Sequence, residues 1–186
     1  MMNTPFKFSD AARLYAQHKA VVDEMYRVFI SDIEKFLDAL RERVAERVTT
    51  GKLDEEGKAG RAWYIWDEED GDDEVPYIWF RIDDAEIVNP GILNLTVLAD
   101  GELKPHREKL KTILSILQLG KNARIVQGTG GQTLFTVIIS YGADDPIGNA
   151  AEPILALLVA LFDAGKQVRV AIRNVSPRPT GSKTQS

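Results

Sequence analysis

The sequence predicts an α+β protein with a long N-terminal helix, a β-hairpin and a ferredoxin-like βαββαβ unit, all sharing one mixed or antiparallel sheet. Two observations carry this prediction. Apolar residues recur at helical spacing up to about Val48. From Gly91 onward, segments typical of strand, helix, strand, strand, helix and strand follow one another, which is the ferredoxin-like order.

Four parts are expected along the chain. Residues 1–60 form the long helix and a linker, and residues 61–90 form an aromatic hairpin with an acidic loop. Residues 91–175 form the ferredoxin-like unit. Residues 176–186 carry no apolar pattern, so we expect a disordered tail.

The first helix is predicted to begin after Ser9, a good capping residue. Its apolar stripe recurs at steps of four and three, at Val22, Tyr26, Phe29, Ile33, Phe36 and Leu40. Such a stripe can form a homodimeric coiled coil or pack on the rest of its own chain. Val21, Met25 and Val28 widen it beyond a narrow seam, which favours packing on the same chain.

The polar stretch Thr49–Gly60 is expected to be a linker. Arg61–Asp67 and Pro76–Asp84 follow as the two strands of the hairpin. In the second strand, apolar and polar residues alternate with the period of two that a half-buried strand shows.

The ferredoxin-like unit is predicted from alternating apolar segments and glycine stops. Its elements are strand Ile92–Ala99, helix Glu102–Leu119, strands Ala123–Gln127 and Thr133–Tyr141, a helix from Asn149 to Gly165, and a last strand Lys166–Arg173. The run Ile154–Phe162 is apolar throughout but shorter than the roughly 20 residues that cross a membrane. We therefore expect it to be covered by the sheet and by the long helix or a second copy of the chain.

Composition restricts the chemistry. The chain has no cysteine, which excludes disulfides, thiolate chemistry and cysteine-based zinc sites. The N-terminal residues Met1–Phe6 do not read as a signal peptide, so we expect a cytoplasmic protein without membrane contact. Residues 1–100 carry 12 Lys and Arg against 22 Asp and Glu, whereas residues 101–186 carry 11 against 6. Such polarisation indicates a charged partner or attraction between the two halves.

The hairpin is the most distinctive feature, because all three tryptophans flank a run of acids. Aromatic residues are enriched at interface hot spots, and a concentrated negative field attracts a basic partner. The candidate binding residues are Trp63, Tyr64, Trp66, Asp67, Glu68, Glu69, Asp70, Asp72, Asp73, Glu74, Tyr77 and Trp79. The run lacks the register of a calcium loop. The open alternatives are a solvated loop, and tryptophans that only pack the hairpin against the long helix.

Basic residues of the predicted second helix could meet phosphates, since Lys104, Arg107 and Lys111 share one face. The sheet face expected to be exposed carries Asn94, Thr96, Thr136, Ser140, Arg169 and Arg173. It lacks the aromatic residues on which bases stack, so nucleic acid is not the favoured partner.

An enzymatic alternative comes from the order of elements. Residues 9–141 follow the order helix, three strands, helix and strand, which resembles the core of PD-(D/E)xK nucleases. The resemblance implies a divalent metal held near the end of the second strand, where Asp83 and Asp84 stand. The third strand lacks the Glu-x-Lys of that family; a Glu102-Leu103-Lys104 triplet follows it instead.

The sequence thus identifies no catalytic residue, metal site or cofactor. It predicts a non-catalytic interaction or accessory protein that uses the hairpin to bind a protein partner, a basic one where the acidic loop makes the contact, within a small homo-oligomer. A metal-dependent nuclease and a small-ligand regulatory domain, the latter by fold analogy, stay open as alternatives.

Overall fold

The computed structural model describes residues 9–56, 61–67, 78–82, 91–99, 101–127, 133–142 and 144–175. The chain divides into two compact units, Met1–Ala39 and Leu40–Ser186. The expected tail, 176–186, and the glycine turn between residues 127 and 133 lie outside the described residues.

The described part of the first unit is helical. Helix α1 spans Asp10–Ala45 and continues into the start of the second unit. Ser9 caps it as predicted, because its Oγ accepts a hydrogen bond from the backbone N–H of Ala12 at 3.2 Å.

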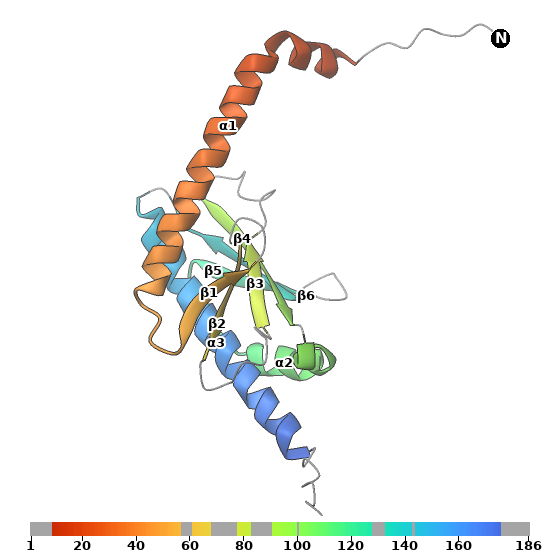
Figure 1. Cartoon of the computed structure of the whole chain (residues 1–186), viewed down its shortest axis with the longest axis vertical. Coiled ribbons are helices and arrows are strands. Elements are labelled where there is room, and N and C mark those ends of the chain that lie inside the picture. The colour runs from red at the N-terminus through yellow and green to blue at the C-terminus, as the bar shows by residue number, and fades with distance from the viewer. Residues whose placement is uncertain are drawn as a thin grey trace, which may run out of the picture. The chain divides into compact units, whose positions relative to one another are not determined.

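The second unit is built on a six-stranded sheet in the order β1-β2-β3-β4-β6-β5, in which every neighbouring pair is antiparallel (Figure 1). The strands are β1 Lys52–Glu56, β2 Ala62–Trp66, β3 Ile78–Ile82, β4 Ile92–Ala99, β5 Ala123–Gln127 and β6 Thr133–Ser140. The predicted hairpin is confirmed, since β2 and β3 pair directly with Trp63 opposite Phe80.

The predicted linker is wrong in one part, because Lys52–Glu56 forms the edge strand β1. Its charges suggested a loop, yet charged side chains are common on edge strands, where they oppose unwanted pairing. Arg41, near the end of α1, fixes this strand through an ion pair between its Nε and the Glu55 Oε2 at 2.8 Å.

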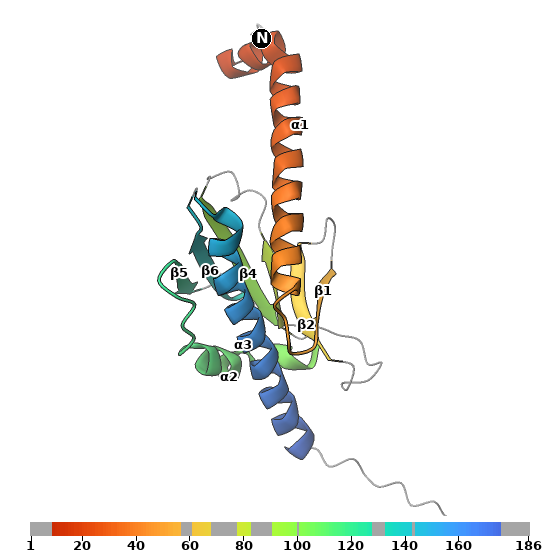
Figure 2. The same cartoon turned by 90° about the vertical axis from the view of Figure 1, so that its left-hand side faces the viewer.

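One face of the sheet is covered by helix α3, Pro146–Val175, with the short helices η2, Gly101–His106, and α2, Arg107–Leu114, beside it (Figure 2). The sheet residues buried on this side include Trp63, Ile65, Ile78, Phe80, Ile82, Leu93, Leu95, Val97, Val137 and Ile139. They meet Ile154, Leu157, Leu158 and Leu161 of α3 in the core. Among the described elements, no helix lies on the opposite side, which we call the open face.

The predicted last strand is wrong, and with it the ferredoxin-like order is not confirmed. Residues 166–173 continue α3 as a helix. Gly165 does not stop it, and Val168 and Arg169 extend the buried stripe with 0% and 9% exposure. Burial of this stripe outweighs the stop signal of the glycine. The α+β class itself holds.

The ends of the other helices also differ from expectation. The capping residue of α3 is Asp145 rather than Asn149, because its Oδ1 accepts the N–H of Gly148 at 3.0 Å. Pro146 then occupies the first helical position, which suits its fixed φ. The predicted helix 102–119 is split into η2 and α2 and ends at Leu114.

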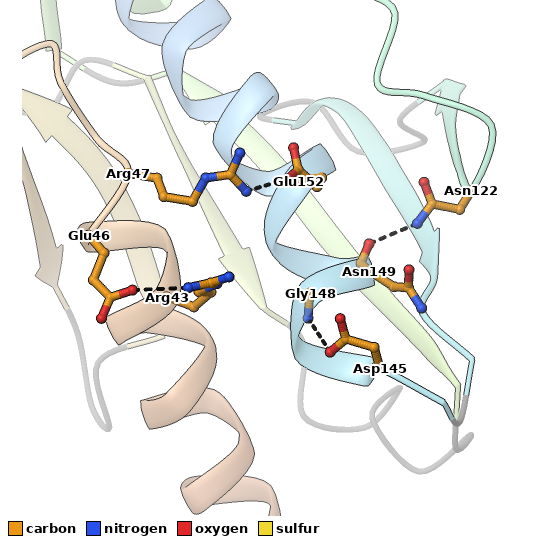
Figure 3. A network of polar contacts seen from close by, with 8 residues as sticks. All are labelled: Arg43, Glu46, Arg47, Asn122, Asp145, Gly148, Asn149 and Glu152. Atoms are coloured by element: carbon orange, nitrogen blue, oxygen red, sulfur yellow. Dashed lines mark hydrogen bonds and ion pairs between the residues drawn. The ribbon is translucent and has the colours of Figure 1, made fainter.

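A proline inside α3 removes one backbone hydrogen bond of the helix. Pro153 has no N–H, so the carbonyl of Asn149 lacks its usual helical partner four residues on. The side chain of Asn122, just before β5, donates to this carbonyl at 2.8 Å (Figure 3). The side chain of Asn149 in turn donates to the Tyr141 carbonyl at 2.9 Å.

By length and composition alone, Pro146–Ile172 could cross a membrane, with a mean hydropathy of 1.5 in its most apolar window. Half of that window is buried inside the protein. A helix that packs against a sheet in a protein core has the same composition.

Candidate binding surface on the open sheet face

The predicted binding residues of β2 and β3 divide between the two faces of the sheet. Trp63 is 1% exposed and packs against Phe80, with 5.7 Å between the ring centroids. Tyr64 and Trp66 alternate with it on β2 and Trp79 alternates with Phe80 on β3, and all three are half-buried. Trp63 is therefore a core residue, whereas the other three aromatic rings present surface on the open face.

These aromatic residues form part of a row across the strands. Asp54 of β1 pairs with Tyr64, and Trp79 pairs with Leu98 of β4. The paired stretch of β2 and β3 ends at Trp63 opposite Phe80, and Tyr64 and Trp79 are the next residues beyond it on the two strands. The hydroxyl of Tyr64 donates to Asp54 Oδ2 at 3.3 Å, which fixes the ring at the β1 side of the row.

A second aromatic side chain on this face, Trp66, lies two residues beyond Tyr64, at the end of β2. Lys52 pairs with Trp66, and its Nζ stands 5.6 Å from the ring centroid. An ammonium group at this distance from an indole is attracted by its π-face. Arg81, exposed on the same face of β3, adds a further positive charge.

Asp67, the first acid of the run, makes a structural contact. Its Oδ2 lies 2.7 Å from Nζ of Lys166 on α3. The same ammonium group stands 4.7 Å from the ring centroid of Phe162. This ion pair ties the end of β2 to the helix on the covered face. The remaining predicted residues, Glu68, Glu69, Asp70, Asp72, Asp73, Glu74 and Tyr77, lie outside the described residues.

The open face does carry aromatic residues, contrary to the expectation on which nucleic acid was disfavoured as a partner. Asn94, Thr96, Thr136 and Ser140 lie on the open face as expected, but β2 and β3 belong to the same sheet and bring aromatic residues to it. Arg169 is not on this face, since it lies on α3 and is 9% exposed. The alternation of Trp79 with Phe80 in the sequence indicated that an aromatic residue lies on the polar face of this strand. The sequence did not indicate that the hairpin pairs with β4 and so belongs to the same sheet.

The nuclease alternative loses the order of elements on which it rested, because four strands rather than three separate α1 from α2. Asp83 and Asp84 lie outside the described residues. Glu102 belongs to η2, and its side chain is outside them too. Lys104 is exposed. Within the described part of the chain, no three His, Asp or Glu side chains are grouped so that they could hold a metal ion.

The structure contains a surface groove that the sequence did not predict. A groove of about 700 Å³ lies between α2 and the edge strand β5. Its lining is both apolar and polar and comprises Glu108, Lys111, Thr112, Leu114, Ser115, Ile125, Leu134 and Phe135. No sequence motif predicts this groove, because the groove results from the antiparallel pairing of β5 with β6.

Comparison of the chain with protein-family models, with curated proteins and with solved structures gave no match in any of the three.

Proposed function

We propose that this is a non-catalytic, cytoplasmic interaction protein that binds a basic protein partner through the open face at β1–β3. The observation that carries the proposal is the division of the hairpin aromatics. Trp63 and Phe80 fill the core, while Tyr64, Trp66 and Trp79 keep accessible surface on a face that no described helix covers. Rigid strands hold these three rings, so little side-chain entropy is lost when a partner packs on them.

The charge near this surface supports a basic partner. Asp54 flanks Tyr64 on the open face. Six further acids between residues 68 and 74 follow Asp67 in the chain and join the end of β2, next to Trp66, to β3. On the described part of the open face Lys52 and Arg81 are positive, so the negative charge that favours a basic partner is that of the acids between residues 68 and 74 of the sequence. A negative field beside an aromatic surface speeds encounter with a positively charged protein and helps orient it.

The experiment compares proteins captured from native lysate by three forms of the chain. Tyr64→Ser/Trp79→Ala removes ring surface from the open face, and Ile116→Ala is the matched control at an apolar residue that is 83% exposed elsewhere. We expect wild type and control to retain the same basic partner, and the double variant to lose it. Equal capture by all three forms contradicts the proposal.

Two further measurements distinguish the alternatives. Quenching of tryptophan fluorescence by single-stranded DNA or RNA that disappears in Trp79→Ala would assign the open face to nucleic acid instead. Magnesium- or manganese-dependent cleavage that is lost in Asp83→Ala would replace the interaction function with nuclease activity.

A further inference from the structure

The first half of α1 exposes an unusual amount of apolar surface. Its large hydrophobic side chains between Leu14 and Phe29 are each between 37% and 67% exposed. They form two parallel rows. Leu14, Val21 and Val28 recur every seven residues, with Met25 between the last two. Tyr15, Val22 and Phe29 recur with the same period, with Tyr26 between the last two.

The two rows lie side by side on the helix. At about 100° per residue, the eight side chains fall within a sector of roughly 160°. We call this the apolar sector of α1. The other side is charged, and its ion pairs are satisfied within the helix. Arg27 contacts Glu24 at 2.7 Å, and Lys19 pairs with Asp23. The first half of α1 is therefore amphipathic, with a polar side whose ion pairs form within the helix and an exposed apolar side.

The apolar sector is large enough for a stable interface. Eight large side chains at about half exposure present on the order of 800 Å², which is the area that one partner contributes to a standard protein–protein interface. The largest apolar patch of a typical monomer is roughly 300–600 Å². The sector therefore exceeds what a monomer usually leaves in water.

The pattern of repeats and charges identifies the occupant. A strict seven-residue repeat is the spacing at which α-helices supercoil around one another, and each row of the sector keeps it. A membrane surface fits less well, because helices that lie on anionic lipid carry a basic polar side. Between Asp10 and Phe29, three basic residues are balanced by three acidic ones.

We infer that the apolar sector of α1 is a self-association surface, occupied by the same sector of a second copy of this chain. This surface lies in the first unit, whereas the open face lies in the second. Assembly and partner binding are therefore separable by mutation, and one inference can fail without the other.

Sedimentation velocity and light scattering on the full chain test the inference. The chain has a mass of 20.7 kDa, and we expect wild type to have at least twice that mass at micromolar concentration. Val21→Glu/Met25→Glu places two charges in the apolar sector and is expected to give a monomer. Ala16→Glu/Ala20→Glu places the same two charges, with the same spacing, on the polar side and is expected to assemble like wild type.

Crosslinking keeps the inference testable if the charged variant fails to fold. The natural chain has no cysteine, so introduced cysteines form disulfides without background. Leu14→Cys and Phe29→Cys, oxidised alone and as a mixture, cover the parallel and antiparallel arrangements of two helices, and Ala20→Cys is the control. We expect covalent dimers from the apolar positions and at least tenfold fewer from the control.

Three results would overturn the inference. The first is a wild-type chain that stays monomeric at about 100 µM. The second is equal assembly of the two glutamate variants. The third is a wild type that is monomeric in solution but sediments with phosphatidylcholine or phosphatidylserine vesicles, which would assign the apolar sector to membrane. In each case Tyr64→Ser/Trp79→Ala reports separately on the open face, because it leaves α1 intact.

Discussion

The side-chain amide of Asn122 donates to the carbonyl of Asn149, at the one point of α3 where Pro153 removes the helical hydrogen bond. A contact between two residues 27 positions apart thus compensates for a proline inside α3. The same contact anchors the segment before β5 to α3 (Figure 3). A backbone group that would otherwise lack a partner is satisfied from another element.

This contact predicts a coupling between two substitutions. Asn122→Ala leaves the Asn149 carbonyl without a donor and should lower the free energy of unfolding by about 1–2 kcal/mol. Pro153→Ala restores the backbone N–H, so Asn122→Ala should have a smaller effect in that background. Urea unfolding of the wild type, the two single variants and the double variant measures the coupling. Strict additivity would contradict the role assigned to Asn122.

A second prediction concerns two glycines of opposite character. A Cβ at Gly165 would lie 3.6 Å from Leu103 and 3.7 Å from Ile78, ordinary contacts inside a helix. Gly165→Ala should therefore stabilise the protein by about 0.5–1 kcal/mol through helix propensity. Gly51 has a φ of +71°, and a Cβ there would lie 2.3 Å from the Trp66 carbonyl oxygen. Gly51→Ala should lower the melting temperature, and equal shifts in the two variants would count against this description.

A third prediction concerns pH. The side-chain hydrogen bond from Arg47 lowers the pKa of Glu152 below its ordinary value. Because this pKa is lower in the folded than in the unfolded chain, the unfolded chain binds more protons in acid, and stability rises with pH in this range. The contribution is present above the unfolded pKa of about 4.3 and is lost as pH falls through the folded value.

Glu152→Gln should therefore reduce the urea midpoint at pH 7, and its difference from wild type should shrink as the pH falls below the unfolded pKa. Both groups are exposed, so the difference at pH 7 should shrink in about 1 M salt. A difference that persists in acid would show that Glu152 acts through packing rather than through its charge.

A fourth prediction separates structure from binding at Asp67. Its ion pair with Lys166 predicts that Asp67→Asn lowers stability by roughly 0.5–1 kcal/mol. In the background Lys166→Gln the same change should have a smaller effect. If Asp67→Asn leaves stability unchanged but weakens partner capture, Asp67 belongs to the binding surface and not to the connection between β2 and α3.

The elements with strong local patterns were predictable from the sequence. The cap at Ser9 and the span of β4 are found where they were expected. A strand was wrongly predicted at Lys166–Arg173, which is helical, because the alternation of Val168, Val170 and Ile172 has the period of two that is typical of a strand. The helical stripe that runs through Leu161, Gly165 and Val168 was the better signal, but a glycine read as a stop concealed it.

The composition of the sequence predicted which segment forms the candidate site, but not which face of the sheet each of its side chains occupies. Aromatic enrichment located Tyr64, Trp66 and Trp79, yet it could not separate them from Trp63, whose face depends on strand register. Register is a long-range property, fixed when β3 pairs with β4 and buries Phe80 opposite Val97. The groove between α2 and β5 also depends on strand pairing, so no local sequence pattern predicted it.

The most direct test of the proposed function is photo-crosslinking in cells from a benzoylphenylalanine placed at Trp79, with the same group at Ile116 as the control. We predict a covalent adduct with a basic protein from position 79 and none from position 116. The absence of a protein adduct at Trp79, or an adduct equally frequent at both positions, would contradict the claim that the open face is where this protein meets its partner.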